Sequence, residues 1–162
     1  MSVDKAEVYL ERSKSSPINL WLSGPVFHDP FFRIILRAIQ RLRSLTFNGA
    51  QRYQDEIATD LSRPMPLLER LSMVGRYKGE SNSWWPHPVL TSAHFDRALP
   101  SLRMLCLKYV TTELSWRRMV NLTSLKLVQT FPVSIKRLLD FFESAPRLCE
   151  VELHFAVSTS GV

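Results

Sequence analysis

One apolar pattern recurs along the chain, and it can be written Pro-x-Leu-x-x-apolar-x-apolar. It occupies residues 66–73, 100–107 and 146–153. Residues 42–47 and 122–127 keep the same apolar frame without the proline, and Leu20 and Leu22 match its last two apolar positions. Alternation of apolar and polar residues over these last positions predicts a strand with one buried face. The chain is therefore expected to contain about six such strands.

Helical spacing lies between the predicted strands. Residues 32–42 carry apolar side chains at helical intervals, after Asp29 as an N-cap candidate and Pro30 at the first helical position. Shorter helical turns are predicted over residues 6–12, 55–61 and 93–98. A further helix is predicted after Ser134, with an apolar face formed by Ile135, Leu138, Leu139 and Phe142.

The alternation of strands and helices predicts the fold class. It gives an α/β, leucine-rich-repeat-like, right-handed solenoid with a curved parallel sheet of about six strands and helices on the convex side. Pro66, Pro100 and Pro146 are expected to end each helix just before the next strand, because proline lacks an amide donor. The long interval between Leu68 and Leu102 requires an insertion. We expect one irregular leucine-rich-repeat domain over residues 1–162.

Composition places the chain among ordinary globular proteins. Of its 162 residues 45% are apolar and 22% are charged, and the net charge of +6 is spread over both halves rather than gathered in a tail. The first residues lack the apolar segment of a signal peptide, and no apolar run reaches membrane-spanning length. A cytoplasmic or nuclear protein without membrane association is expected. Cys106 and Cys149 have the spacing of neither a disulfide framework nor a zinc site, so both are expected to be reduced.

Several phrases of the chain, in their order, resemble the leucine-rich region of basidiomycete F-box-like proteins. They are YLERS at residues 9–13, SPINL at 16–20, PLLERLS at 66–72, Trp116, and NLTSL at 121–125. The resemblance implies a substrate-recognition arm of a cullin-type ubiquitin ligase, tied to the adaptor subunit through an N-terminal F-box. No F-box opening precedes Tyr9, so adaptor binding is not expected of this chain. We expect the chain to be a fragment or a shortened member of that family.

The polar positions of the predicted strands form the candidate binding surface, because they line the concave face of such a solenoid. They fall in three rows: Asn19, Ser44, Arg70, Met104, Ser124 and Glu150; Trp21, Thr46, Ser72, Cys106, Lys126 and Glu152; and Ser23, Asn48, Val74, Lys108, Val128 and His154. A groove with such varied hydrogen-bonding groups suits a polypeptide better than a small charged substrate. The alternative is a merely solvated sheet. The residues expected to contact a protein partner are Trp21, Thr46, Arg70, Ser72, Met104, Cys106, Lys108, Lys126, Glu150, Glu152 and His154.

Two other features have both a functional and a structural interpretation. Trp84 and Trp85 lie in the polar insertion and either anchor a partner or fold back onto the flank of the solenoid. Arg33, Arg37 and Arg41 recur at helical spacing, with Arg43 just beyond. They offer a phosphate-binding stripe or a solvated convex face, and nucleic-acid binding through them is the alternative function.

No catalytic motif is evident. The histidines at 28, 87, 94 and 154 share no metal-ligand spacing, and the chain has neither a nucleophile elbow nor a phosphate loop. No residue near Cys106 or Cys149 marks a general base, so both are interpreted as small strand residues. We therefore predict a non-catalytic protein-interaction module without metal or cofactor. An enzyme with an unrecognised site is the remaining alternative.

Overall fold

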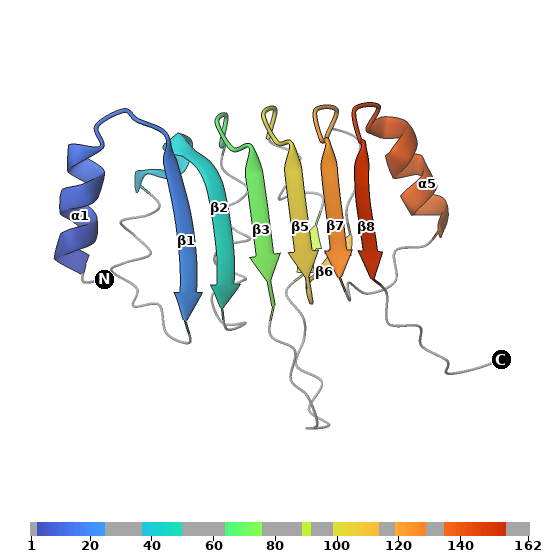
Figure 1. Ribbon diagram of the computed structural model, residues 1–162, viewed down its shortest axis with the longest axis horizontal. Helices are drawn as coiled ribbons and strands as arrows, with labels where there is room; N and C mark the ends of the chain where they lie inside the picture. Colours follow the sequence, from blue (N-terminus) through green and yellow to red (C-terminus); the bar gives the residue numbers. More distant parts are fainter. Residues whose placement is uncertain are drawn as a thin grey trace, which may run out of the picture.

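The computed structural model describes residues 3–24, 37–49, 64–75, 89–91, 99–113, 119–128 and 135–154. Over these ranges the chain is α/β and contains a parallel, six-stranded sheet in the order β1-β2-β3-β5-β7-β8 (Figure 1). The expected parallel sheet is therefore confirmed. Its strands are β1 (Ile18–Gly24), β2 (Leu42–Gly49), β3 (Arg70–Val74), β5 (Met104–Lys108), β7 (Ser124–Val128) and β8 (Glu150–His154).

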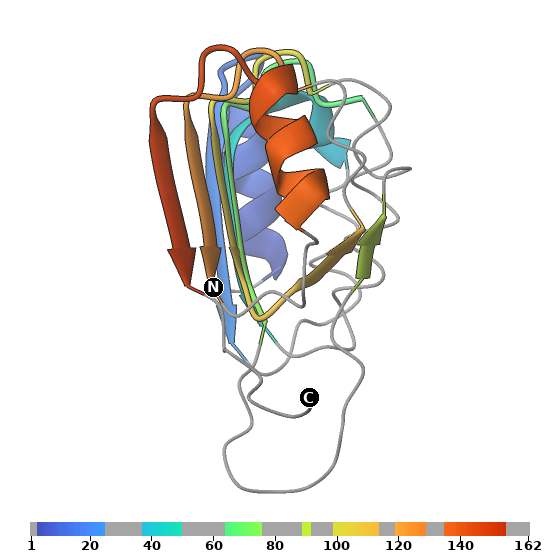
Figure 2. The same cartoon turned by 90° about the vertical axis from the view of Figure 1, so that its right-hand side faces the viewer.

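The two α-helices that the structure describes lie at the two ends of the sheet. Helix α1 (Val3–Arg12) lies beyond β1 and helix α5 (Ile135–Ser144) lies beyond β8. Figure 2 shows both on the same side of the sheet, so no helix of the described part of the chain covers the other face, which is called the open face below. Both confirm the helices predicted at the start of the chain and after Ser134. The predicted turns at 55–61 and 93–98 fall outside the described residues.

Two details of the predicted helices are wrong. The helix expected to run through Leu42 ends earlier, in the 3-10 turn η1 (Ile39–Arg41), because the Leu42 N–H bonds to the Ile39 carbonyl and Leu42 is already extended. In α5, Leu139 is 56% exposed, whereas Phe141 is fully buried. Leu138, Phe141 and Phe142 share one helix face at spacings of three and four residues, and Leu139 points away from it.

The core lies between the sheet and the helix side. Alternate strand residues point inward and are almost fully buried, as the burial patterns of β3, β5 and β7 show. Each strand thus follows the alternation in its sequence, and its other residues stay on the open face. The largest fully buried side chains are Phe47, Phe141, Leu42, Met65, Leu68, Leu71, Met73, Leu102, Leu105, Leu107 and Leu122.

The recurring prolines occupy tight turns. In each turn the N–H of the repeat's first leucine bonds to the carbonyl three residues earlier, as in Leu68 to Met65 at 3.1 Å and Leu102 to Leu99 at 3.0 Å. Pro66 and Pro100 thus stand at the second position of a four-residue turn, which suits their fixed φ. The same turn precedes Leu148, and there Pro146 follows the end of α5 at Ser144. The proline therefore shapes the turn into the strand, a role that the helix-ending interpretation missed.

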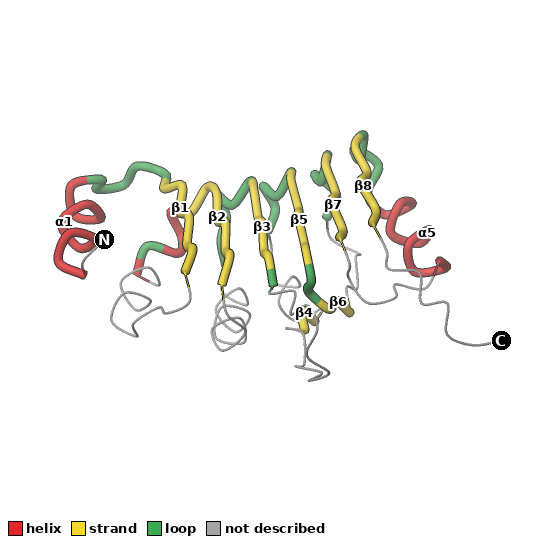
Figure 3. Tube along the Cα trace, turned by 60° about the horizontal axis from the view of Figure 1, so that its bottom comes forward, coloured by secondary structure: helices red, strands yellow, loops and turns green. Residues whose placement is uncertain are grey.

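A second, two-stranded sheet was not predicted. It pairs β4 (Val89–Thr91) with β6 (Thr111–Glu113) in parallel. Figure 3 shows it outside the row of the main strands. The chain leaves β5 through Tyr109, whose φ of 55° is rare for a bulky residue. A Cβ added at Gly75 would lie 2.3 Å from the Tyr109 carbonyl oxygen, so this exit needs glycine at position 75.

Candidate interaction surface

The three predicted rows of the open face are confirmed by the register of the sheet. Trp21 pairs with Thr46, and the row continues through Ser72, Cys106 and Lys126 to Glu152. The rows that begin at Asn19 and Ser23 follow the same register up to Glu150 and His154. Because the helices lie on the other side of the sheet, these rows face away from the core.

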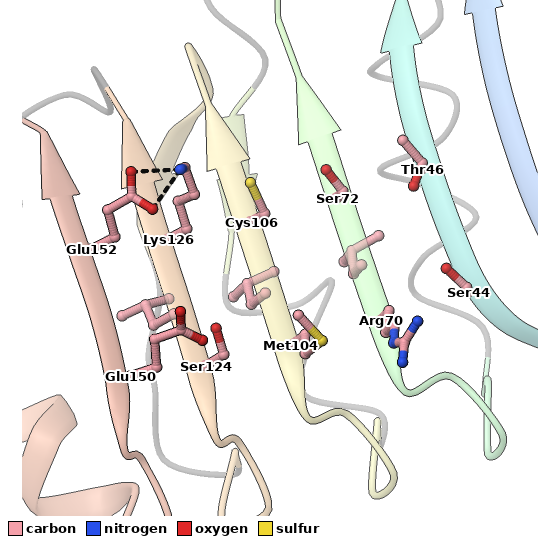
Figure 4. A pocket seen from close by; sticks show the side chains of 13 residues that line it. Ser44, Thr46, Arg70, Ser72, Met104, Cys106, Ser124, Lys126, Glu150 and Glu152 are labelled. Carbon is pink, nitrogen blue, oxygen red and sulfur yellow. Dashed lines mark hydrogen bonds and ion pairs between the residues drawn. The ribbon is translucent and has the colours of Figure 1, made fainter.

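The open face is hollowed into a groove of about 430 Å³ that crosses the strands from β2 to β8. Figure 4 shows its lining side chains, which come from the first two rows and from the leucines between them, Leu71, Leu105 and Leu125. Trp21, Lys108 and His154 were predicted to share this surface but do not line the groove. Ser44 and Ser124 line it, although they were not among the expected contact residues. The predicted residues that the groove brings together are Thr46, Arg70, Ser72, Met104, Cys106, Lys126, Glu150 and Glu152.

One row of the groove carries opposite charges on β3 and β8. Arg70 on β3 and Glu150 on β8 are both exposed, and Met104 and Ser124 lie between them. Among the described residues, neither charged side chain has an ion-pair partner. Met104 is 42% exposed, which is unusual for a methionine in the middle of a sheet. This row therefore offers a cation, an apolar contact and an anion in sequence.

The second row ends in an ion pair. Both carboxylate oxygens of Glu152 accept hydrogen bonds from Lys126 Nζ, and His154 Nε2 lies 2.8 Å from Glu152 Oε1. The bond from Lys126 holds the pKa of Glu152 below its ordinary 4.5, and the same bond raises the pKa of Lys126 above 10.5. Both side chains are half-exposed, so solvent screens the pair. Lys126 is thereby fixed toward β8 instead of being free in the groove.

Both cysteines are free thiols in different surroundings. Cys106 is partly buried in the groove, in the row between Ser72 and Lys126. Cys149 is exposed just before β8, and its Sγ lies 3.3 Å from the Thr123 carbonyl oxygen. The chain thus carries one thiol inside the groove and one outside it.

The arginine stripe has internal partners in the part that the structure describes. Arg41 donates through Nη2 to Ser13 Oγ at 2.6 Å and to the Ser16 carbonyl at 3.1 Å, so it joins the end of α1 to the turn before β2. Arg37 lies 3.8 Å from Glu7 on α1, and Arg43 bonds Glu69 at 2.9 Å. The guanidinium of Arg41 is partly exposed and also holds the end of α1, a structural role that the sequence did not indicate. Arg33 lies outside the described residues.

The remaining candidate residues of the sequence are the paired tryptophans and the histidines. Trp84 and Trp85 lie outside the described residues, as do the histidines at 28, 87 and 94. Within the described ranges, no three His, Cys, Asp or Glu residues are grouped so that they could hold a metal ion. His154 contacts Glu152 and is the last residue of β8.

Sequence reasoning missed a set of polar turn residues. Ser101 Oγ donates to the Pro66 carbonyl at 2.6 Å, and Asn121 Nδ2 donates to the Pro100 carbonyl at 2.7 Å. Arg147 Nη1 continues the series to Asn121 Oδ1 at 3.0 Å. These bonds tie each turn to the one before it. The available signal was a polar residue at the third position of the turn in each of these repeats.

Comparisons of this chain with protein-family models, with curated proteins and with solved structures found no match. The two α-helices that the structure describes have 10 residues each, and none of the described helices is long and apolar enough to cross a membrane.

Proposed function

We propose that this chain is a non-catalytic interaction module that binds an extended polypeptide segment in the groove of its open face. The observation that carries the proposal is a groove crossing five neighbouring strands whose lining side chains are polar, apolar and charged in turn. Neighbouring strands lie about 4.8 Å apart, so the groove spans about 19 Å. An extended segment of about six residues fits that length.

The chemistry of the lining favours a polypeptide. Ser44, Thr46, Ser72 and Ser124 offer hydrogen bonds without a formal charge, and the exposed Met104 offers a deformable apolar contact. Trp21 is 77% exposed at one end of the row that contains Thr46 and Ser72. Tryptophan is enriched among residues that dominate protein–protein binding energy. A partner longer than the groove would therefore reach Trp21 as an additional contact.

The separation of Arg70 and Glu150 suggests the charge pattern of the segment. The two residues stand in one row, three strand spacings or about 14 Å apart. This is the length of about four extended residues. The preferred segment has an acidic side chain near Arg70, a basic side chain near Glu150 and an apolar side chain between them at Met104.

The finer architecture is part of the proposal. We take the sheet to be the inner layer of an irregular leucine-rich-repeat solenoid, because the same turn recurs before its strands and the register is constant from β2 to β8. The resemblance to F-box-like proteins makes substrate recognition for a ubiquitin ligase one form of the proposed function. Two free thiols agree with a reducing compartment, the cytoplasm or the nucleus. Nucleic-acid binding is disfavoured, because Arg41 and Arg43 are already bonded within the chain.

The test begins with a probe, because the natural partner is unidentified. A phage-displayed library of random peptides is selected on the immobilised protein, and an enriched peptide is synthesised with a fluorophore. Its dissociation constant is then measured for Arg70→Glu and Met104→Asp, which alter the groove. Matched controls are Lys136→Glu and Leu139→Asp, which make the same kinds of change at exposed positions of α5.

The proposal expects binding to weaken by about tenfold or more in the groove variants and to stay within about twofold in the controls. Melting temperatures of all variants are compared to establish that each is folded. Failure to enrich any peptide, or equal weakening in groove and control variants, would count against the proposed function.

A further inference from the structure

Trp21 is the single tryptophan, tyrosine or phenylalanine in the three rows of the open face. It lies in the middle of β1, with Thr46 of β2 as its register partner, and yet it is 77% exposed. Tryptophan is highly buried on average in folded proteins, so such exposure is unusual for this residue type. Most of the apolar surface of its indole ring is therefore accessible to a ligand.

The neighbours of Trp21 on the open face are polar and uncharged. Two lie before and after it on β1 and three lie on β2, and together with Trp21 they are called the Trp21 platform: Asn19, Ser23, Ser44, Thr46 and Asn48. Among the described residues, none of these five side chains makes a hydrogen bond within the chain. Amide and hydroxyl groups both donate and accept hydrogen bonds. The platform thus offers an exposed indole surrounded by donors and acceptors that a ligand can use.

The distribution of charge separates the platform from the rest of the open face. In the three rows, the strands from β3 onward each carry a charged residue, namely Arg70, Lys108, Lys126, Glu150 and Glu152. The residues that β1 and β2 contribute to these rows include none. The platform therefore favours an uncharged ligand. Nucleic acid is a poor match, because proteins that stack its bases on aromatic side chains also place cations along its phosphates.

A pyranose sugar has the complementary surface. One side of its ring presents C–H groups, which are attracted to the electron-rich face of an indole, and its rim carries hydroxyl groups. These hydroxyls exchange hydrogen bonds with amides and hydroxyls such as those of Asn19 and Thr46. An apolar peptide side chain fits less well. A tryptophan that dominates a protein interface is surrounded by contacts that exclude water, whereas the described neighbours of Trp21 on this face are all polar.

We propose that the Trp21 platform is a second binding site, which takes a free, neutral oligosaccharide of pyranose units. One unit stacks on Trp21 and bonds Thr46 on the adjacent strand. Asn19 and Ser23 stand about 6.6 Å on either side of Trp21 along β1, where they meet the neighbouring units. The site goes beyond the polypeptide groove, with which it shares only Ser44 and Thr46.

The experiment titrates the full chain with three neutral oligosaccharides, cellohexaose, mannohexaose and chitohexaose, and with hexagalacturonate as the charged counterpart. Isothermal titration calorimetry at physiological salt gives the dissociation constants. At least one neutral oligosaccharide is expected to bind, and to bind more tightly than hexagalacturonate. Absence of binding by all three neutral oligosaccharides, or tighter binding of hexagalacturonate, would overturn the proposal.

Variants locate the binding, and melting temperatures establish that each is folded. Trp21→Ala should weaken the oligosaccharide by at least about tenfold, and Trp21→Tyr, which keeps an aromatic ring, should weaken it less. Asn19→Ala should weaken it by about threefold and serves as the second variant if Trp21→Ala does not fold. Met104→Ala is the control, because Met104 is an exposed apolar residue of the same face outside the platform, and it should stay within about twofold.

Unchanged binding in both Trp21→Ala and Asn19→Ala would contradict the assignment of the site. If a peptide selected from the random library depends on Trp21 while no oligosaccharide binds, Trp21 belongs to the polypeptide site and the proposal is overturned. Arg70→Glu, which alters the groove, should keep oligosaccharide binding. The proposed function and this inference therefore fail separately.

Discussion

Asn121 joins two turns of the repeat by accepting from one neighbour and donating to the other. Its Nδ2 donates to the Pro100 carbonyl oxygen at 2.7 Å, and its Oδ1 accepts from Arg147 Nη1 at 3.0 Å. The turns on either side precede β5 and β8. Side chains therefore connect neighbouring repeats in the turns that precede the strands, outside the backbone hydrogen bonds of the parallel sheet.

Replacing Asn121 with alanine should lower the free energy of unfolding by about 1 kcal/mol, because both hydrogen bonds are lost in a partly exposed setting. Denaturation by urea measures the change. Val120→Ala is the matched control, since Val120 is the adjacent turn residue, is 51% exposed and has no side-chain hydrogen-bonding group. Equal effects of the two substitutions would contradict the role assigned to Asn121.

Val120 occupies the turn position that proline holds before β3, β5 and β8. Val120→Pro should therefore raise the free energy of unfolding by about 0.5 kcal/mol, because it restricts the unfolded chain at a compatible backbone position. Asn121→Pro, one residue later, should destabilise instead, because it removes both side-chain hydrogen bonds of Asn121. Thermal melts show whether each variant raises or lowers the melting temperature. If both lower it, the turn before β7 differs from the turns that contain proline.

Gly75→Ala should destabilise the fold by more than about 1 kcal/mol. The new Cβ would lie 2.3 Å from the Tyr109 carbonyl oxygen, which is backbone and cannot rotate away. The chain would have to shift at the exit from β5, where Gly75 N–H also bonds the Lys108 carbonyl at 2.8 Å. Urea denaturation gives the magnitude, and an unchanged midpoint would mean that this contact is not close in solution.

The bond between Lys126 and Glu152 should make stability depend on pH in acid. The folded protein holds the pKa of Glu152 below 4.5, so the unfolded state binds the proton more readily. The contribution of this carboxylate is present above about pH 4.5 and is lost as the pH falls through the lowered folded pKa. Glu152→Gln should therefore lose less stability than the wild type between about pH 5 and pH 3, because the lowered pKa of Glu152 is absent from it. Urea denaturation at each pH measures the free energy of unfolding.

Lys126→Met provides the matched test of that pH dependence. It removes the donor with the largest lowering effect on the pKa of Glu152 but leaves the bond with His154, so its loss of stability in acid should be shallower than that of the wild type and steeper than that of Glu152→Gln. Salt should weaken the effect in the wild type, because both side chains are half-exposed. If both variants lose stability in acid as steeply as the wild type, the pH dependence comes from other groups.

The rows of the open face could be predicted because strand side chains alternate with a period of two, and the repeat fixed the register from Ser44 to Glu150. The pairing of β4 with β6 could not be predicted, since short strands carry little periodic signal. The role of Arg41 was also hidden, because its partners Ser13 and Ser16 are far away in sequence. The burial of Phe141 in place of Leu139 depends on which face of α5 meets the sheet.

The same limit applies to the candidate site. Alternation identified which residues face outward, but the bond from Lys126 to Glu152 needs a particular side-chain direction across two strands. Lys108 and His154 share a row with Val74, yet the groove does not extend to them. The extent of a groove depends on the size and conformation of the side chains that border it, and strand periodicity does not predict these conformations.

Protection of the two thiols tests the open face most directly. The protein is treated with a maleimide, with and without the peptide selected from the random library, and the labelling rates of Cys106 and Cys149 are measured by mass spectrometry. Cys106 lines the groove and Cys149 lies outside it, so each molecule carries its own control. The proposed function predicts slower labelling of Cys106 with peptide and no change at Cys149. Unchanged labelling of Cys106 under saturating peptide would contradict it.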